Sequence, residues 1–286
     1  IFGDGNVGRG FLGQLFCESG YEIVFVDIDK PLIRALNRGA YTLRLVDNDG
    51  EEDVCVGPVR GLLSSDGSAV AEALAEASLG ATSVGARALE HIAPLVAGGV
   101  ALRAERGIEE PLNLIVCENL KGAADIFRDM VGERLGNRAL AYLATHVGFI
   151  DTVIGRMVPQ VPPELRGQDP TLILAEPYKE LPVDRSGFVG DIPKILGMSA
   201  CDDFERYTAR KLYLHNMGHA ILSYLGYRRG HMLGYEAVED PEVRPILDAA
   251  LDESARGIAA RYGASENWLR EHAADLPRRF ANRALA

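Results

Sequence analysis

Cysteine is scarce in this chain of 286 residues, and no two cysteines lie close together in the sequence. Cys17, Cys55, Cys117 and Cys201 include no Cys-x-x-Cys pair, which argues against a disulfide framework and against a sulfur-ligated zinc site. No apolar run approaches the roughly 18–20 residues of a transmembrane helix, and no secretory signal pattern begins the chain. We therefore expect a cytoplasmic protein that does not enter a membrane.

Basic residues are outnumbered by acidic ones. The chain has 41 acids against 30 bases, with a formal net charge of −11 and a pI near 5.1. This excess of negative charge argues against a nucleic-acid-binding protein, whose affinity depends on neutralising phosphates. The 47% hydrophobic and 25% charged residues are typical of a globular protein with ample core. The length indicates about two domains.

The first half of the sequence alternates short apolar runs with helical patterns. Strands are predicted at residues 21–26, 81–84 and 112–117, and helices at 11–19, 31–38, 69–78 and 86–96. Such alternation indicates a mostly parallel sheet wrapped by helices. We predict the α/β class, with a Rossmann-type doubly wound sheet in residues 1–150 and a mainly α-helical substrate domain in residues 151–286.

Two stretches depart from this alternation. Residues 158–193 hold seven of the fourteen prolines, so this stretch is expected to be irregular or short-stranded. The pattern from residue 203 onward is helical, with an interruption near residues 226–234. A glycine turn follows only two apolar residues at the start, whereas a buried strand usually has about five or six. We expect both termini to be incomplete.

The glycines at the start form the spacing Gly3-x-Gly5-x-x-Gly8, with a helix after them and a second strand that ends at Asp27. In a dinucleotide site the first glycine allows a tight turn, the second admits the pyrophosphate, and the third lets the helix pack on the strand. The first amides of that helix stabilise the anion. The pattern therefore predicts a cofactor site, the alternative being a glycine-rich turn in an unrelated α/β domain.

Asp27 follows Gly8 by 19 residues, which is the usual place of the acid that accepts the ribose hydroxyls of NAD. The same carboxylate would repel the 2′-phosphate of NADP. We therefore expect NAD as the cofactor. The alternative is that Asp27 only caps a helix.

A second group of polar residues lies between residues 210 and 220. At 100° per residue, Lys211, His215, His219 and Asn216 fall within about 140° of one helix face. Leu212 and Leu222 flank this face, and a core stripe is expected on the opposite side, made of Leu214, Met217, Ile221 and Leu225. A face with one lysine, two histidines and an amide fits a lined site better than open solvent.

Three interpretations of this face compete. In the first, the face belongs to a partly buried helix whose histidines are satisfied by hydrogen bonds. In the second, it is a metal site built on His215 and His219. In the third, it is an alcohol dehydrogenase site with Lys211 as the base. The metal site lacks the glutamate of helical zinc motifs, because Asn216 follows His215, and no third ligand is evident. A desolvated lysine has a lowered pKa and can take the proton of an alcohol.

The motif Gly3 to Phe11, then Cys117-Glu118-Asn119, then Lys211-x-x-x-x-Asn216-x-x-His219 resembles the mannitol dehydrogenase family of long-chain polyol dehydrogenases, most closely its polyol-phosphate branch. The resemblance covers essentially the whole chain. Further matches are Ser83-Val84-Gly85, 89–94, 147–151, Arg156-Met157-Val158-Pro159 and 279–282. The resemblance implies a Rossmann domain, a helical substrate domain, and catalysis without a metal.

The resemblance also implies roles for single residues. Lys211 would be the general acid/base, Asn119 and Asn216 would hold the reacting oxygen, and His219 would orient the substrate. Asn119 also lies at the end of a predicted strand, where α/β sheets bind ligands, although it could instead cap a helix. We expect no metal ligands, and cofactor contacts from Gly3, Gly5, Asn6, Val7, Gly8, Asp27, Ser83, Val84 and Gly85.

The chain departs from the family at two places. Relatives commonly carry Asp-Arg where this chain has Gly155-Arg156, and they continue for a further helical segment beyond Arg283. A phosphate clamp would have to come from basic residues, for which the candidates are Lys179, Arg185, Lys194 and Arg210.

The expected activity is the NAD-dependent interconversion of D-mannitol 1-phosphate and D-fructose 6-phosphate. The alternatives are a related dehydrogenase of free polyols or hexuronates, and an NAD-binding protein without catalysis. We expect a monomer or small homo-oligomer whose partner is a small sugar phosphate or polyol, and we expect neither nucleic acid nor membrane as a partner.

Overall fold

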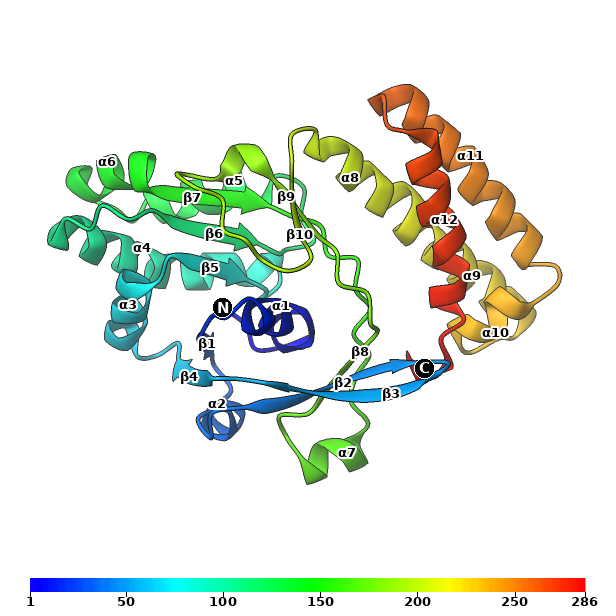
Figure 1. The fold of residues 1–286 in the computed structure, drawn as a ribbon, viewed down its shortest axis with the longest axis horizontal. Coiled ribbons are helices and arrows are strands. Elements are labelled where there is room, and N and C mark those ends of the chain that lie inside the picture. Colours follow the sequence, from blue (N-terminus) through cyan, green and yellow to red (C-terminus); the bar gives the residue numbers. More distant parts are fainter. Residues whose placement is uncertain (286) are drawn as a thin grey trace. The chain divides into compact units, whose positions relative to one another are not determined.

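The computed structural model of the protein describes residues 1–285 (Figure 1). These residues form two compact units, of which the first contains Ile1–Leu45 and Glu52–Asp202. The second contains Val46–Glu51 and the chain from Asp203 onward. No helix among the described residues is long and apolar enough to cross a membrane.

A parallel sheet forms the centre of the first unit. Its strands are β1 (Ile23–Asp27), β4 (Val59–Leu63), β5 (Leu79–Thr82), β6 (Leu112–Val116) and β7 (Val147–Asp151). β1 pairs with β4, and β6 pairs with both β5 and β7, all in parallel. Phe2 bridges Val26 on one side and Thr82 on the other. The resulting order, β4–β1–Phe2–β5–β6–β7, is that of the doubly wound dinucleotide-binding sheet, which confirms the predicted fold class.

Helices connect these strands and cover the sheet. They are η1 (Gly8–Leu12, a π-helix), α1 (Gly13–Glu18), α2 (Lys30–Leu36), α3 (Gly67–Glu76), η2 (Ala86–Ala88), α4 (Leu89–Arg106), α5 (Ala123–Gly132) and α6 (Asn137–His146). Acidic side chains cap two of them, because Asp29 accepts from the amide of Leu32 and Asp66 accepts from the amide of Ala69. Strands and helices meet in one buried apolar cluster, which includes Phe2, Leu89, Leu112, Phe127 and Phe149.

Arg103 on α4 stabilises this layer from within, although it is only 1% exposed. Its guanidinium donates to the carbonyls of Leu74, Ala75 and Ala77 at 3.1, 2.9 and 2.8 Å, which lie at the end of α3. It also donates to the carbonyl of Glu110 and the hydroxyl of Tyr142. One cation therefore satisfies carbonyls that a helix leaves without partners at its end.

We predict that Arg103→Met lowers the free energy of unfolding by at least about 3 kcal/mol, because several buried carbonyls lose a charged donor. Urea denaturation measures this change. The matched control is Arg106→Met on the same helix, whose guanidinium pairs with Glu72 at the surface, so its replacement should change the free energy of unfolding much less. Equal losses in the two variants would contradict this account of the core.

The rest of the first unit consists of short strands and irregular segments, as the prolines of residues 158–193 predicted for that stretch, although a short helix, Pro163–Gln168, also lies there. Its further elements are α7 (Pro163–Gln168), β8 (Ile173–Ala175), β9 (Leu181–Asp184), η3 (Arg185–Gly187) and β10 (Met198–Cys201), together with β2 (Tyr41–Asp47) and β3 (Gly50–Val56) apart from their residues 46–51. β8 pairs in parallel with β2, and β10 with β9. The boundary expected after residue 150 therefore falls inside this unit, because β8, which follows β7 in the chain, pairs with β2.

The second unit is helical. Its elements are α8 (Phe204–Arg210), η4 (Lys211–Asn216, a π-helix), α9 (Met217–Arg229), α10 (Gly234–Glu239), α11 (Arg244–Tyr262), α12 (Glu266–Phe280) and η5 (Arg283–Leu285). The break between α9 and α10 lies in the expected interruption. Asn282 donates to the carbonyl of Val46 at 2.9 Å, and Asn48 donates to that of Ala281 at 3.0 Å, so the short segment 46–51 belongs to this unit.

Candidate active site

The glycine turn has the geometry that its spacing predicts. Gly3 has a φ of +90°, and a Cβ placed on it would lie 2.5 Å from the carbonyl oxygen of Ser83. A Cβ on Gly8 would collide with the carbonyl oxygen of Gly3. Gly5 differs from both, because the space around its Cα is open and the residue is exposed. The turn therefore packs tightly on two sides and leaves backbone accessible at Gly5.

The helix after this turn begins in a π-helical conformation, and a second segment of the chain holds it. Arg156 is buried and donates to the carbonyl of Gly10 at 3.1 Å and to the side chain of Gln14 at 2.7 Å. The side-chain amide of Asn6 donates to the carbonyl of Val158 at 3.2 Å. The segment that contains Arg156 and Val158 thus contacts both the turn and the helix after it. π-Helical turns occur frequently at functional sites.

Asp27 lies at the carboxyl end of β1 and is held by backbone amides. Its Oδ2 accepts from the amide of Asp4 at 3.0 Å, and its Oδ1 accepts from those of Ile28 and Asp29 at 2.6 and 3.1 Å. A carboxylate can accept about four hydrogen bonds, so Asp27, which is half-buried, retains capacity for an outside donor. Ile28 beside it is 81% exposed and offers an apolar surface. These features fit the ribose and base of a dinucleotide.

A third loop lies against the glycine turn. The hydroxyl of Ser83 donates to the carbonyl of Gly3 at 3.1 Å, and the amide of Val84 donates to the carboxylate of Glu118 at 3.0 Å. Glu118 is buried at the end of β6. In the sequence Glu118 was noted only as part of the motif Cys117-Glu118-Asn119, and its contact with Val84 was not predicted. The signal available was an acid directly after a buried strand.

Asn119 follows Glu118 and is exposed at the same end of the sheet. The next helix, α5, begins at Ala123 with Gly122 as its N-cap residue. Asn119 is therefore not the cap of that helix, which was the alternative to a role in the site.

Lys211, Asn216 and His219 lie on one continuous helical segment of the second unit. Lys211 and Asn216 are the first and last residues of η4, and His219 lies in the first turn of α9. All three are half-buried. Burial lowers the pKa of Lys211 below its usual value, which increases the fraction of neutral amine able to accept a proton.

The π-helical turn changes the face that the spacing predicted. Besides His215, the buried positions are Leu214, Gly218, Leu222 and Gly226, whereas Met217, Ile221 and Leu225 are only half-buried. Leu222 was expected to flank the polar face and is buried instead. In a π-helix the hydrogen bonds run from residue i to i+5, so each residue turns by less than the 100° assumed for an α-helix.

His215 lies beneath the polar face rather than on it, with 6% of its surface exposed. Its ring meets the edges of His219 and Phe280, with centroids 4.8 and 5.6 Å apart. Its Nδ1 is buried and has no hydrogen-bond partner among residues 1–285. The interpretation in which every histidine here is satisfied by hydrogen bonds therefore does not hold for His215.

Three histidines of this unit are kept neutral by their surroundings. Burial lowers the pKa of His215 to about 2, and the charges of His219 and Arg279 add to the effect. Burial, followed by the charge of Arg279, lowers the pKa of His219 to about 4. Burial lowers the pKa of His272 to about 3, with contributions from Arg210 and Arg279. At neutral pH these three rings are therefore uncharged.

We predict that stability falls as the pH decreases below 6.5, because the unfolded chain takes up protons that the buried histidines do not. Each such histidine lowers the free energy of unfolding by up to about 1.4 kcal/mol for every pH unit below 6.5. His215→Gln should therefore reduce the slope between pH 6.5 and 5 by about that amount, as measured by urea denaturation. His91→Asn, at an exposed position of α4, is the matched control. An unchanged slope in His215→Gln would contradict the assignment.

Three of the four basic residues considered for a phosphate clamp have contacts with other side chains. Lys179 forms an ion pair with Glu18 at 2.8 Å, and Arg185 forms one with Asp202 at 2.8 Å. Arg210 is buried and lies 4.4 Å above the ring of Trp268. Lys194 is exposed. Within residues 1–285, no three histidine, cysteine or acidic side chains gather in the manner of a metal site.

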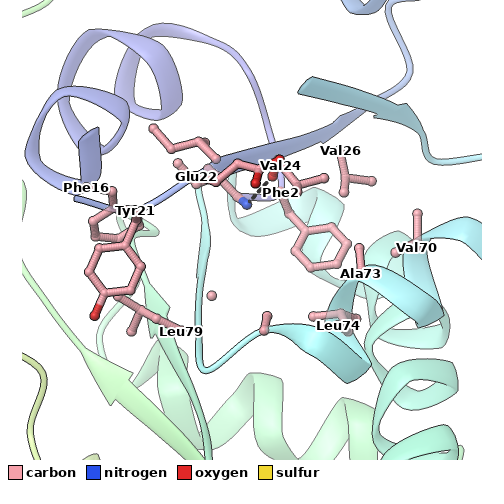
Figure 2. Close-up of a pocket in the computed structure, with 14 residues that line it drawn as sticks. Phe2, Phe16, Tyr21, Glu22, Val24, Val26, Val70, Ala73, Leu74 and Leu79 are labelled. Carbon is pink, nitrogen blue, oxygen red and sulfur yellow. Dashed lines mark hydrogen bonds between the residues drawn. The ribbon is translucent and has the colours of Figure 1, made fainter. Parts of the chain in front are cut away.

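An apolar pocket with a cavity volume of about 90 Å³ opens at the opposite end of the sheet (Figure 2). Phe2, Val70, Leu74 and Leu79 line it, and Glu22 at its edge is the charged residue of its lining. It lies where β1 and β5 begin, whereas ligands of doubly wound sheets bind where the strands end. The pocket is therefore not the candidate active site.

Comparison with known proteins agrees with this architecture. Residues 1–197 match the mannitol dehydrogenase Rossmann domain, and residues 203–286 match the mannitol dehydrogenase C-terminal domain. The chain belongs to the mannitol dehydrogenase family. The boundary between the two family domains lies between residues 197 and 203 of the sequence, close to the division between the two compact units after Asp202.

Solved structures of this family and beyond share the fold. Mannitol 2-dehydrogenase of Pseudomonas fluorescens, in a ternary complex with NAD and D-mannitol, is 19% identical, with a TM-score of 0.78 over 100% of this chain and 68% of that one. A substrate-free D-sorbitol dehydrogenase is 18% identical, with a TM-score of 0.82 over 99% of this chain and 69% of that one. An octopine dehydrogenase in complex with NADH and agmatine is 13% identical, with a TM-score of 0.50 over 99% of this chain and 73% of that one.

Proposed function

We propose that this member of the mannitol dehydrogenase family is an NAD-dependent, metal-independent polyol dehydrogenase, and more narrowly a mannitol-1-phosphate 5-dehydrogenase. It would interconvert D-mannitol 1-phosphate and D-fructose 6-phosphate. The observation that carries the proposal is the desolvated amine of Lys211 on a π-helical turn that also holds Asn216, with His219 one turn later. The phosphorylated substrate is proposed from the resemblance of the Gly3–Phe11 motif to the polyol-phosphate branch.

The first unit offers the groups that would hold the cofactor. The amides of Asn6, Val7 and Gly8 begin the helix that would face the pyrophosphate, and the open position of Gly5 admits it. Asp27 would accept the ribose hydroxyls, and its negative charge favours NAD over NADP. Ser83, Val84 and Gly85 complete the proposed contacts. When bound, the nicotinamide supplies the acceptor for the hydride that leaves the alcohol carbon.

The second unit offers the proton chemistry. A neutral Lys211 can take the hydroxyl proton as the carbonyl forms, and the protonated amine returns it in the reverse direction. The side-chain amides of Asn216 and Asn119 are proposed to donate to the reacting oxygen and so stabilise its negative charge. His219, neutral because its pKa is lowered to about 4, is proposed to orient the substrate by a hydrogen bond.

The decisive assay follows NADH oxidation with fructose 6-phosphate, fructose and fructuronate at equal concentrations. We predict a strong preference for fructose 6-phosphate, and a loss of kcat by about 10²–10⁴-fold in Lys211→Met, because the acid/base group is gone. Arg228→Met, at an exposed position of α9, is the matched control. Preference for fructose or fructuronate would contradict the substrate, and full activity of Lys211→Met would contradict the base.

Asp27 allows a separate test of the cofactor. We predict that Asp27→Ser lowers kcat/KM for NAD about 10–100-fold, because hydrogen bonds to a charged acceptor are lost, and that it raises the rate with NADP. The measurement is the ratio of kcat/KM with the two cofactors. Asp29→Asn is the matched control, since asparagine also caps a helix well. An unchanged ratio in Asp27→Ser would exclude Asp27 as the ribose-binding acid.

A further inference from the structure

Asp4 lies between the first two glycines of the turn, and its carboxyl group is an unusual feature there. The residue is 3% exposed, and its Oδ2 is buried without a hydrogen-bond partner among residues 1–285. Its backbone amide donates to Oδ2 of Asp27 at 3.0 Å, so the two acids are neighbours. A buried polar atom without a partner is costly, and a buried carboxylate costs more than a buried carboxylic acid.

Few charges compensate this carboxyl group. Asp27 faces it from the end of β1 and Asp29 from the following loop, and both disfavour a negative charge on Asp4. Arg9, on the helix after the turn, favours a negative charge on Asp4. Its hydrogen bonds, however, go to backbone carbonyls, from Nε to that of Asp4 and from Nη1 to that of Thr171. Burial first, and then the charge of Asp27 and a hydrogen bond with it, raise the pKa of Asp4 to about 7.

We propose that Asp4 is a positioning residue that must carry a proton for the dinucleotide to bind, so that its ionisation sets the upper pH limit of cofactor affinity. The protonated group is neutral, so it neither repels Asp27 nor opposes the approach of the diphosphate. The ionised group would place a second negative charge in the turn. That charge repels both Asp27 and the diphosphate that approaches the turn.

This inference rests on the proposed cofactor site, and it adds a group that the glycine spacing does not include. The position between the first two glycines is open to many residue types in that spacing. An acid there is compatible with an anionic ligand only when it is neutral. Binding of the dinucleotide should therefore stabilise the protonated form of Asp4 and draw a proton from solvent near neutral pH.

Isothermal titration calorimetry of the full chain with NADH tests the proposal without any need for turnover. Titrations at pH 6, 7, 8 and 9 and fixed ionic strength, in buffers of different ionisation enthalpy, give both Kd and the number of protons taken up. We expect uptake to approach one proton per NADH above neutral pH. Kd should then rise by up to about tenfold per pH unit.

Asp4→Asn keeps the shape of the side chain and removes its titration. We expect this variant to bind NADH with a Kd that is nearly independent of pH and without proton uptake, and thermal unfolding verifies that it is folded. Asp29→Asn is the matched control, because Asp29 is an exposed acid near the same turn. Its proton uptake should persist.

Several results would overturn the proposal. Wild-type protein that binds NADH with constant Kd and no proton uptake excludes a titrating group in the turn, and this result needs no variant. Proton uptake that persists in Asp4→Asn, or that disappears only in Asp29→Asn, assigns the proton to another group. Absence of NADH binding at every pH would instead refute the cofactor site itself, and is thereby distinguishable from failure of the inference alone.

Discussion

The close contact between Gly8 and the carbonyl of Gly3 is the constraint on which the first unit depends. The contact excludes any side chain at Gly8 and lets the first helix begin directly above the sheet. Phe2 just before the turn joins the two halves of the sheet through its bridges to β1 and β5. The same few residues therefore complete the strand order and present the amides of a helix start at the carboxyl end of the sheet.

The second unit depends on desolvation. Burial keeps His215 and His219, on the helical segment that carries Lys211, and His272, on α12, neutral, and it lowers the pKa of the lysine. A neutral amine can accept a proton from an alcohol, which is the role proposed for Lys211. Packing in this unit thus has a chemical consequence, since the apolar surroundings that stabilise the helix also set the charge of its polar face.

Much of this could be predicted from the sequence, for reasons specific to certain residues. Glycine spacing and strand–helix alternation predicted the parallel sheet, because backbone sterics leave few choices at Gly3 and Gly8. The face of the helix after Lys211 could not be derived, because a π-helical turn has no sequence signal comparable to the α-helical period. The contact of Glu118 with Val84 also escaped prediction, because it joins the ends of two strands that are distant in sequence.

The glycine turn and the loops beside it are proposed to hold the dinucleotide. Hydrogen–deuterium exchange of the full chain with and without NADH tests this claim at the level of single segments. We predict slower exchange in peptides that contain residues 3–12, 27–29 and 83–85, and no change in α6, which lies away from the carboxyl ends of β1 and β5. Protection confined to other segments, or none despite saturating NADH, would contradict the account.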